Sequence, residues 1–225
     1  FDLLGKPVLF RVIDRVLESK RIDRIIVATT TKKRDDIIVK MVKNYHPKIT
    51  FFRGPEIDLL DRYYGAVKEY NPHLVVRITA DCPLIDPEVI DKVINSAIKF
   101  NGDYVSNTLK TRTYPRGLDV DVFSFNLLKE LWENITWNVD REHVILFTRR
   151  NHSLFKCKSV LHYADYSHYR LTLDEVDDYK LIKIIYKSIY PIKPNFKFQD
   201  MIHFLNKNPE LAKINQHVEQ KNPNY

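Results

Sequence analysis

The sequence predicts an α/β fold built on a mostly parallel sheet with helices on both faces. Two observations support this class. Through the first hundred residues, short β-branched runs alternate with longer segments of helical periodicity, which is typical of βαβ units. Beyond Gly102 this alternation ends, and the second half is expected to form a mixed, lid-like elaboration on the same sheet.

The elements of the first half follow from apolar spacing and from turn residues. Helices are predicted over 7–20, 35–44, 58–70 and 87–100, and strands over 24–30, 49–52 and 73–78. Apolar residues recur every three or four positions in the helical segments. Pro87 stands at a first-turn position, which proline favours because its missing N–H is not needed there.

The second half is predicted to mix short strands and helices. Strands are expected over 104–106, 118–123, 155–162 and 168–173, and helices over 124–133, 141–149, 175–189 and 199–205. A polar loop over 107–117 separates the first two strands. With no repeat, low-complexity tract or long linker, residues 1–225 are expected to form a single domain.

Composition excludes several classes of protein. Hydrophobic residues make up 44% and charged residues 29% of the chain, a globular balance, and no apolar run approaches the roughly 20 residues of a membrane span. The net charge of +7 comes from scattered basic residues, which indicates a solvated surface or a phosphate-bearing small substrate rather than nucleic acid. Two cysteines and no recognisable leader favour a reduced, cytoplasmic protein without a disulfide.

Two carboxylates are candidates for a divalent-metal site. Asp81 follows the strand predicted over 73–78 and precedes a proline-started helix, so it is expected at the carboxyl edge of the sheet, where open sheets bind ligands. Asp174 ends the predicted strand over 168–173 in the same way. Magnesium binds one or two carboxylates together with phosphate oxygens and water. The structural alternatives are a turn cap for Asp81 and a helix N-cap for Asp174.

Two further segments carry groups that suit a sugar or a phosphate. In the loop over 113–121, Arg116 is able to bind a carboxylate or phosphate through two N–H groups, and Asp119 and Asp121 are expected to share one face of a strand. Glu142 and His143 open a predicted helix and suit hydrogen bonds to hydroxyls. A surface hairpin and a structural histidine are the respective alternatives. The sequence contains no phosphate-binding glycine loop, zinc-protease motif or nucleophile elbow of the common patterns.

Taken together, these segments resemble the cytidylyltransferase family that includes spore coat polysaccharide biosynthesis proteins. The family is related to acylneuraminate and 3-deoxy-manno-octulosonate cytidylyltransferases. The matching segments are 5–9, 26–31, 52–54, 60–63, 77–87, 115–120, 141–144, 170–174, 208–211 and 214–215. The resemblance implies a Rossmann-like nucleotidyltransferase of the glycosyltransferase-A-like kind. Its expected reaction joins CMP from CTP to a sugar and releases pyrophosphate. The product would serve the biosynthesis of cell-surface or spore coat polysaccharide.

The resemblance also implies roles for individual residues. Asp81 and Asp174 would hold Mg²⁺ and, with Arg77, act in catalysis. The expected nucleotide contacts are Thr29, Arg53, Asp58, Arg77 and Thr79, and the expected sugar contacts are Arg116, Asp119, Glu142, His143 and Arg170. Residues 1–100 would form the nucleotide-binding half, 101–174 a sugar-binding and dimerisation region, and 175–225 C-terminal helices. The expected partners are CTP, a sugar and a second copy of the chain.

One departure from the family pattern concerns the amino terminus. Family members begin with a buried strand and a basic, glycine-containing loop that cradles the triphosphate. This sequence starts at Phe1, just after where that loop would end. The missing strand would lie between the strands near Ile25 and Val75. Its absence would leave both of these strands with unpaired edges. We therefore expect the 225 residues to come from a longer chain.

Two alternative functions are also compatible with the sequence. A glycosyltransferase that uses a nucleotide sugar would need an Asp-x-Asp metal motif, and Asp119-Val120-Asp121 is the one candidate. A non-catalytic remnant that binds a nucleotide or a sugar would agree with the missing loop.

Overall fold

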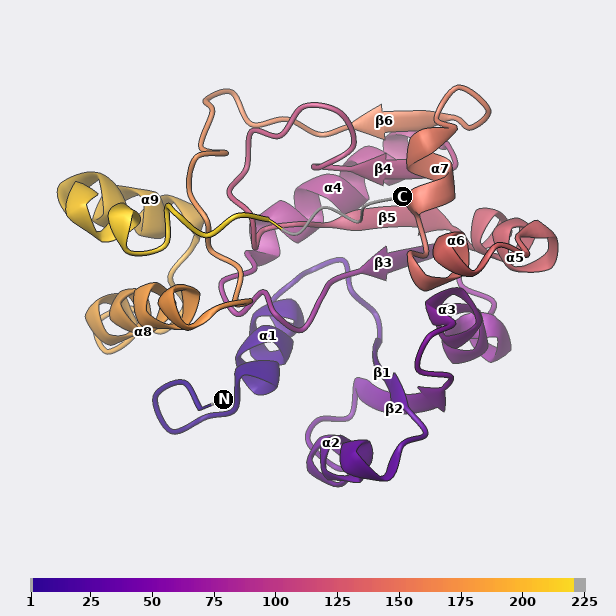
Figure 1. The fold of residues 1–225 in the computed structure, drawn as a ribbon, viewed down its shortest axis with the longest axis horizontal. Helices are drawn as coiled ribbons and strands as arrows, with labels where there is room; N and C mark the ends of the chain where they lie inside the picture. The colour runs from indigo at the N-terminus through magenta and orange to yellow at the C-terminus, as the bar shows by residue number, and fades with distance from the viewer. Residues whose placement is uncertain (1, 221–225) are drawn as a thin grey trace.

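The computed structural model describes residues 2–220, and its first half follows the predicted alternation (Figure 1). The elements are α1 (Val8–Leu17), β1 (Ile25–Thr30), α2 (Asp36–Val42), β2 (Ile49–Gly54), α3 (Leu59–Val67), β3 (Leu74–Arg77) and α4 (Pro87–Phe100). Short 3₁₀ turns over Lys33–Asp35 and Lys68–Tyr70 precede α2 and extend α3. Every predicted element of this half is present, and α4 has the predicted bounds.

The second half is less regular. It contains β4 (Tyr104–Ser106), β5 (Asp121–Ser124), α5 (Phe125–Asn134), α6 (Asn138–Glu142), α7 (Leu146–Arg150), β6 (Cys157–Ser159), α8 (Val176–Ile189), α9 (Phe198–Lys207) and a closing 3₁₀ segment over Pro209–Ile214. The strand predicted over 118–123 is shorter than expected, since β5 begins only at Asp121.

Two predictions for this half are wrong. The helix expected over 141–149 is divided into α6 and α7, because His143 and Ile145 have non-helical backbone angles. The strand expected over 168–173 does not form. The backbone hydrogen bonds of this segment go to two separate loops: Leu171 N donates to Arg116 O at 2.7 Å and Leu173 N to Asp81 O at 2.8 Å. Among residues 2–220, its one β-bridge is between Arg116 and Arg170.

The strands of the described residues form two sheets. In the first, β1 pairs with β2 in parallel. In the second, the order is β3-β5-β4-β6, with antiparallel pairing of β5 to both neighbours and parallel pairing of β4 to β6. Within residues 2–220, β1 and β3 are therefore not hydrogen-bonded to each other.

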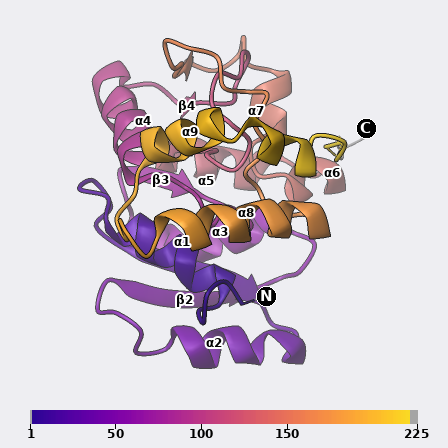
Figure 2. The ribbon, with the colours of Figure 1, turned by 90° about the vertical axis from the view of Figure 1, so that its left-hand side faces the viewer.

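Both faces of the four-stranded sheet are buried, as predicted. Side chains alternate along a strand, so Val105 and Val122 pack in one cluster while Tyr104 and Phe123 pack in another. The first cluster contains residues of α4, α8 and α9, and the second contains residues of α3 and α5. Figure 2 shows α8 and α9 side by side along one end of the molecule. A third cluster joins α1 and α2 to the small sheet.

Two compositional expectations are also tested by the structure. Cys82 is buried and Cys157 is partly exposed, and both are free thiols, as the cysteine count predicted. Among the described residues, the helices are too short or too polar for any of them to cross a bilayer.

Candidate functional site

A cavity lies at one edge of the four-stranded sheet. Because β5 runs antiparallel to β3 and β4, the carboxyl ends of those two strands meet its amino end, where Arg77, Ser106 and Asp121 are register partners. The residues that line the cavity are Arg77, Thr79, Asp81, Cys82, Arg116, Gly117, Asp119, Thr172, Asp174 and Gln220. We call this the main cavity. It lies at the carboxyl edge of β3 and β4, where the sequence predicted a ligand site.

The main cavity brings together residues that are far apart in the sequence. Leu173 N donates to Asp81 O at 2.8 Å and Thr172 Oγ1 to the same oxygen at 3.4 Å. These bonds hold the loop that carries Asp81 against the segment that carries Asp174. Six predicted site residues consequently line one cavity: Arg77, Thr79, Asp81, Arg116, Asp119 and Asp174.

The three carboxylates of the cavity differ in their partners. Asp119 accepts two hydrogen bonds from Arg112, at 2.5 and 2.8 Å. Asp174 accepts from Arg170 Nη2 at 2.6 Å. Asp81, within residues 2–220, forms no ion pair and accepts only a weak bond from the Cys82 thiol at 3.4 Å. Asp81 is therefore the carboxylate most available to a cation.

The donor set is chemically suited to magnesium but not to a metal bound by protein ligands alone. In the described part of the chain, no group of three or more His, Cys, Asp or Glu side chains is arranged to hold a metal. Asp81 and Asp174 provide two carboxylates in one cavity, which is the number that magnesium takes when phosphate oxygens and water complete its coordination.

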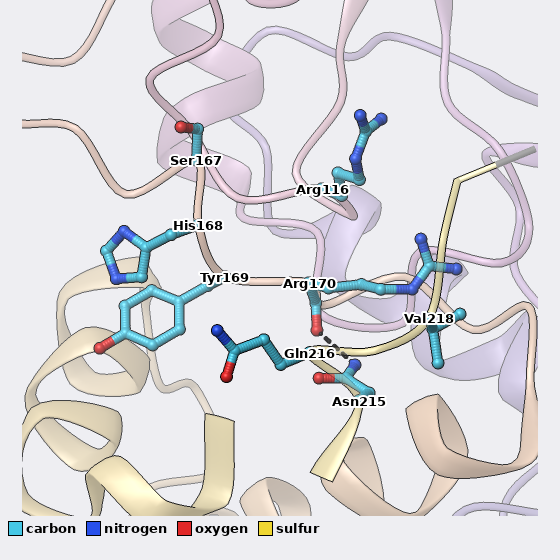
Figure 3. A pocket seen from close by; sticks show the side chains of 8 residues that line it. All are labelled: Arg116, Ser167, His168, Tyr169, Arg170, Asn215, Gln216 and Val218. Carbon is cyan, nitrogen blue, oxygen red and sulfur yellow. Dashed lines mark hydrogen bonds between the residues drawn. The ribbon is translucent and has the colours of Figure 1, made fainter. Parts of the chain in front are cut away.

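Arg116 lies between the main cavity and an adjoining one. The adjoining cavity is lined by Arg116, Ser167, His168, Tyr169, Arg170, Asn215, Gln216 and Val218 (Figure 3). Burial lowers the pKa of Arg116, and the positive charge of nearby Arg112 lowers it further. Within residues 2–220 its guanidinium donates no hydrogen bond, so it is available to an anionic group.

Arg170, in contrast, is already engaged with the protein. Its guanidinium donates to Asp178 at 2.8 and 3.0 Å, to Asp174 and to Gln220. Asn215 Nδ2 donates to the carbonyl oxygen of Arg170 at 2.9 Å, the bond drawn in Figure 3. Arg170 thus ties the segment that carries Asp174 to the C-terminal residues 215–220.

Comparison with known proteins shows the family of this chain. The family model described as "Cytidylyltransferase" matches residues 1–222. The chain belongs to the cytidylyltransferase family. It is thereby assigned to the CTP-dependent nucleotidyltransferases, as the resemblance implied.

Individual relatives of this cytidylyltransferase span most of its length. An uncharacterized protein, MJ1063 of Methanocaldococcus jannaschii, is 39% identical over 220 residues, which cover 95% of this chain and 86% of that protein. The spore coat polysaccharide biosynthesis protein SpsF of Bacillus subtilis is 29% identical, over 91% of this chain and 84% of that protein. The solved structure of a cytidylyltransferase from Leptospira borgpetersenii superposes with a TM-score of 0.89 at 29% identity, covering 99% of this chain and 91% of that one.

Six predicted site residues of the cytidylyltransferase lie outside the lining of the main cavity: Thr29, Arg53, Asp58, Glu142, His143 and Arg170, the last of which lines the adjoining cavity. Thr29 and Arg53 are neighbours across the small sheet, and Arg53 donates to Thr30 O at 2.9 Å and pairs with Asp36. Asp58 caps α3 by accepting from Asp61 N. Glu142 and His143 lie at the end of α6. Their roles toward substrates stay predictions.

Four lining residues were not assigned a role from the sequence: Cys82, Gly117, Thr172 and Gln220. Burial raises the pKa of the Cys82 thiol well above its usual value, and Asp81 raises it further. The thiol therefore stays protonated, which argues against a nucleophilic role. The position of Gln220 depends on how the C-terminal segment folds back, for which the local sequence gives no signal.

Proposed function

We propose that this chain transfers CMP from CTP to a sugar hydroxyl and releases pyrophosphate, for the synthesis of cell-surface polysaccharide. The observation that carries the proposal is the meeting of Asp81 and Asp174 with Arg77 and Arg116 in the main cavity. Two carboxylates and two guanidiniums in one place suit a triphosphate that is bound together with a cation.

The proposed reaction is a single displacement at the α-phosphorus of CTP. The sugar oxygen forms a new bond to that phosphorus, the bond to the bridging oxygen of the β-phosphate breaks, and the hydroxyl proton is released. Catalysis of such a step consists mainly of positioning and of neutralising charge. Arg77 and Arg116 would contact the anionic phosphate groups. Thr79 would donate a hydrogen bond from its hydroxyl to the nucleotide.

Magnesium is the proposed cofactor. Asp81 and Asp174 would hold it, and when bound it would neutralise charge on the phosphate oxygens. Asp81 is partly exposed in the cavity and Asp174 is 37% exposed, so both carboxylates are accessible to an ion from solvent.

The remaining contacts of the proposal come from the resemblance. Thr29, Arg53 and Asp58 are proposed to lie along the nucleotide, and Asp119, Glu142, His143 and Arg170 toward the sugar. Arg170 would act there through its one remaining N–H group, since the other four N–H groups of its guanidinium already donate to protein partners. We propose that residues 1–225 work as one domain in the cytoplasm and pair as a homodimer.

The geometry disfavours the alternative of a glycosyltransferase with an Asp-x-Asp metal motif. Asp119 lines the cavity, but Asp121 is 1% exposed and accepts bonds from Arg77 and Arg149. The two carboxylates therefore do not face one ion, and the motif does not serve as a metal site.

Calorimetric titration of CTP in the presence of magnesium chloride tests the proposal, with the longest natural chain that carries residues 1–225. Asp81→Asn keeps the size of the side chain and removes its charge. We expect it to weaken CTP binding by about tenfold or more, which corresponds to ~1.4 kcal/mol. Asp91→Asn is the matched control, because Asp91 lies on α4 and bonds to Ser19 and to the backbone of Lys20.

Two results would contradict the proposal. If the natural protein binds no CTP with magnesium, or if Asp81→Asn and the control bind it alike, the main cavity is not the nucleotide site. Where binding is confirmed, release of pyrophosphate from CTP, measured with a panel of neutral and acidic sugars, identifies the acceptor.

A further inference from the structure

Asp121 is a buried carboxylate directly behind the main cavity. It begins β5, is 1% exposed and does not line the cavity. Its register partner on β3 is Arg77, which does line the cavity. A buried charge at this position requires partners, and these partners suggest a purpose beyond packing.

The two oxygens of Asp121 are used differently. Oδ1 accepts from Tyr104 Oη at 2.6 Å, Ser106 Oγ at 2.8 Å and Arg149 Nη2 at 2.9 Å. Within residues 2–220, Oδ2 accepts only from Arg77 Nη1, at 3.0 Å. Three donors from β4 and α7 therefore fix the plane of the carboxylate, and its second oxygen is left to hold one guanidinium.

The charges of this cluster leave the Arg77 side positive. Burial acts to raise the pKa of Asp121, but Arg149, Arg77 and the hydrogen bonds from Tyr104 and Ser106 outweigh it and keep the pKa below its usual value. The carboxylate is thus ionised at neutral pH. One negative and two positive groups give a net positive charge, and Arg77 is the member that reaches the cavity.

This arrangement would prepare Arg77 for an anion. A free arginine side chain loses up to about 2 kcal/mol of rotamer entropy when it is fixed, and a guanidinium that is already held loses less on binding. The anion shares the cavity with Asp81 and Asp174, which repel it unless cations are present. A fixed arginine is therefore useful there.

We propose that Asp121 is a positioning residue that orients Arg77 toward the triphosphate of CTP. The proposal rests on the proposed function and deepens it. Asp121, which does not line the main cavity, would act through Arg77 and not by contact with the nucleotide. A purely structural role for Asp121 would stabilise the sheet without a specific effect through Arg77.

A double-mutant cycle separates these two roles. CTP affinity is measured for the natural protein, Asp121→Asn, Arg77→Met and the double variant. We expect Asp121→Asn to weaken CTP binding about tenfold in the natural background and to have no further effect beside Arg77→Met. Equal weakening in both backgrounds would overturn the proposal.

A milder variant keeps the test valid if Asp121→Asn fails to fold. Tyr104→Phe removes one donor to Oδ1 without changing charge, and it should weaken CTP binding severalfold only when Arg77 is present. Tyr45→Phe is the matched control, since Tyr45 Oη likewise donates to a carboxylate, that of Asp14 at 2.7 Å, beside α1 and α2. CTP affinity that is unchanged in Tyr104→Phe and in Asp121→Asn would overturn the proposal.

Two readouts distinguish a role in phosphate binding from general damage. Cytidine carries no phosphate, so its affinity should be unchanged in Asp121→Asn, and an equal loss for cytidine and CTP would count against the proposal. The ¹⁵Nε signal of Arg77 should shift with CTP in the natural protein and less in Tyr104→Phe. Absence of CTP binding by the natural protein would contradict the proposed function instead.

Discussion

Arg170 and Asp174 are joined by a hydrogen bond of 2.6 Å between Nη2 and Oδ2. The carboxylate that we propose as a magnesium ligand is thus held by Arg170, whose side chain is 8% exposed and is fixed to Asp178. Such a bond orients the carboxylate, and the positive charge of Arg170 partly offsets its negative charge. A cation that binds Asp174 must share the carboxylate with Arg170.

This relationship predicts separate effects on binding and on stability when the charge of Asp174 is removed. Asp174 is more than one third exposed, so solvent screens the pair, and Asp174→Asn should cost no more than about 1 kcal/mol of folding free energy. Magnesium-dependent CTP affinity should fall about tenfold or more, measured by calorimetry beside thermal unfolding.

Asp177→Asn is the matched control for Asp174→Asn. Asp177 lies three residues away and pairs with Lys180 at 2.6 Å on the surface of α8. It should leave CTP binding unchanged. Asp174→Asn with natural affinity for CTP and magnesium would exclude Asp174 as a ligand.

A second prediction concerns Asp178, whose carboxylate is fully buried. It accepts from Arg170, from Asn215 and from the backbone N–H groups of Asp174 and Glu175. Asp178→Ala leaves the guanidinium without its main partner, and the loss of one partner of a buried pair costs roughly 3–5 kcal/mol. For a protein of this size we expect Tm to fall by about 10 °C, measured by calorimetry. A fall as small as that of the surface variant Asp177→Asn would contradict this role.

The same carboxylate predicts a pH dependence of stability. Burial acts to raise the pKa of Asp178, but hydrogen bonds from Arg170, Asn215 and the two backbone N–H groups lower it below its usual value. A group whose folded pKa is depressed contributes stability above its unfolded pKa, about 3.9, and loses it as the pH falls toward the folded pKa. The stability difference between the natural protein and Asp178→Asn should therefore be constant above about pH 5 and shrink below about pH 4. A constant difference down to about pH 3 would contradict the assignment.

Much of the site was predictable because the local sequence around Asp81 determines the strand, the loop and the helix that position it. A β-branched run, a loop with Asp81 and a helix starting at Pro87 place a carboxylate at a sheet edge by local geometry alone, and the structure has these elements in these places. Local sequence also suggested a helix cap at Asp174. The structure assigns that cap to Glu175, with Asp178 completing a capping box.

The remainder depends on contacts between distant segments. The run over 169–173 has the composition of a strand, yet its backbone bonds are divided between the loops of Arg116 and Asp81. Gln220 reaches the main cavity because Asn215 anchors the chain to Arg170 and Asp178. Neither arrangement follows from periodicity or turn chemistry, since both depend on tertiary hydrogen bonds.

Gly117 shows how closely these distant segments approach. Its φ is +98°, and a Cβ atom at this position would lie 2.3 Å from the carbonyl carbon and oxygen of Leu171. Gly5 also has a positive φ, +74°, but a Cβ atom there would meet no other atom within 4 Å. Alanine at Gly5 should therefore cost only the backbone strain of about 1–2 kcal/mol.

Gly117→Ala should cost this strain and an overpacking penalty of about 1–3 kcal/mol or more. The clash lies on the backbone of Leu171 and Thr172, so relief requires the segment to move away from the loop of Gly117. Thr172 lines the main cavity and bonds to Asp81 O, and such a movement would separate the two proposed metal ligands. We expect Gly117→Ala to lower Tm by more than Gly5→Ala and to weaken CTP binding with magnesium, whereas Gly5→Ala should bind normally. Equal Tm values for the two variants would show that the contact between Gly117 and Leu171 is looser than the structure indicates.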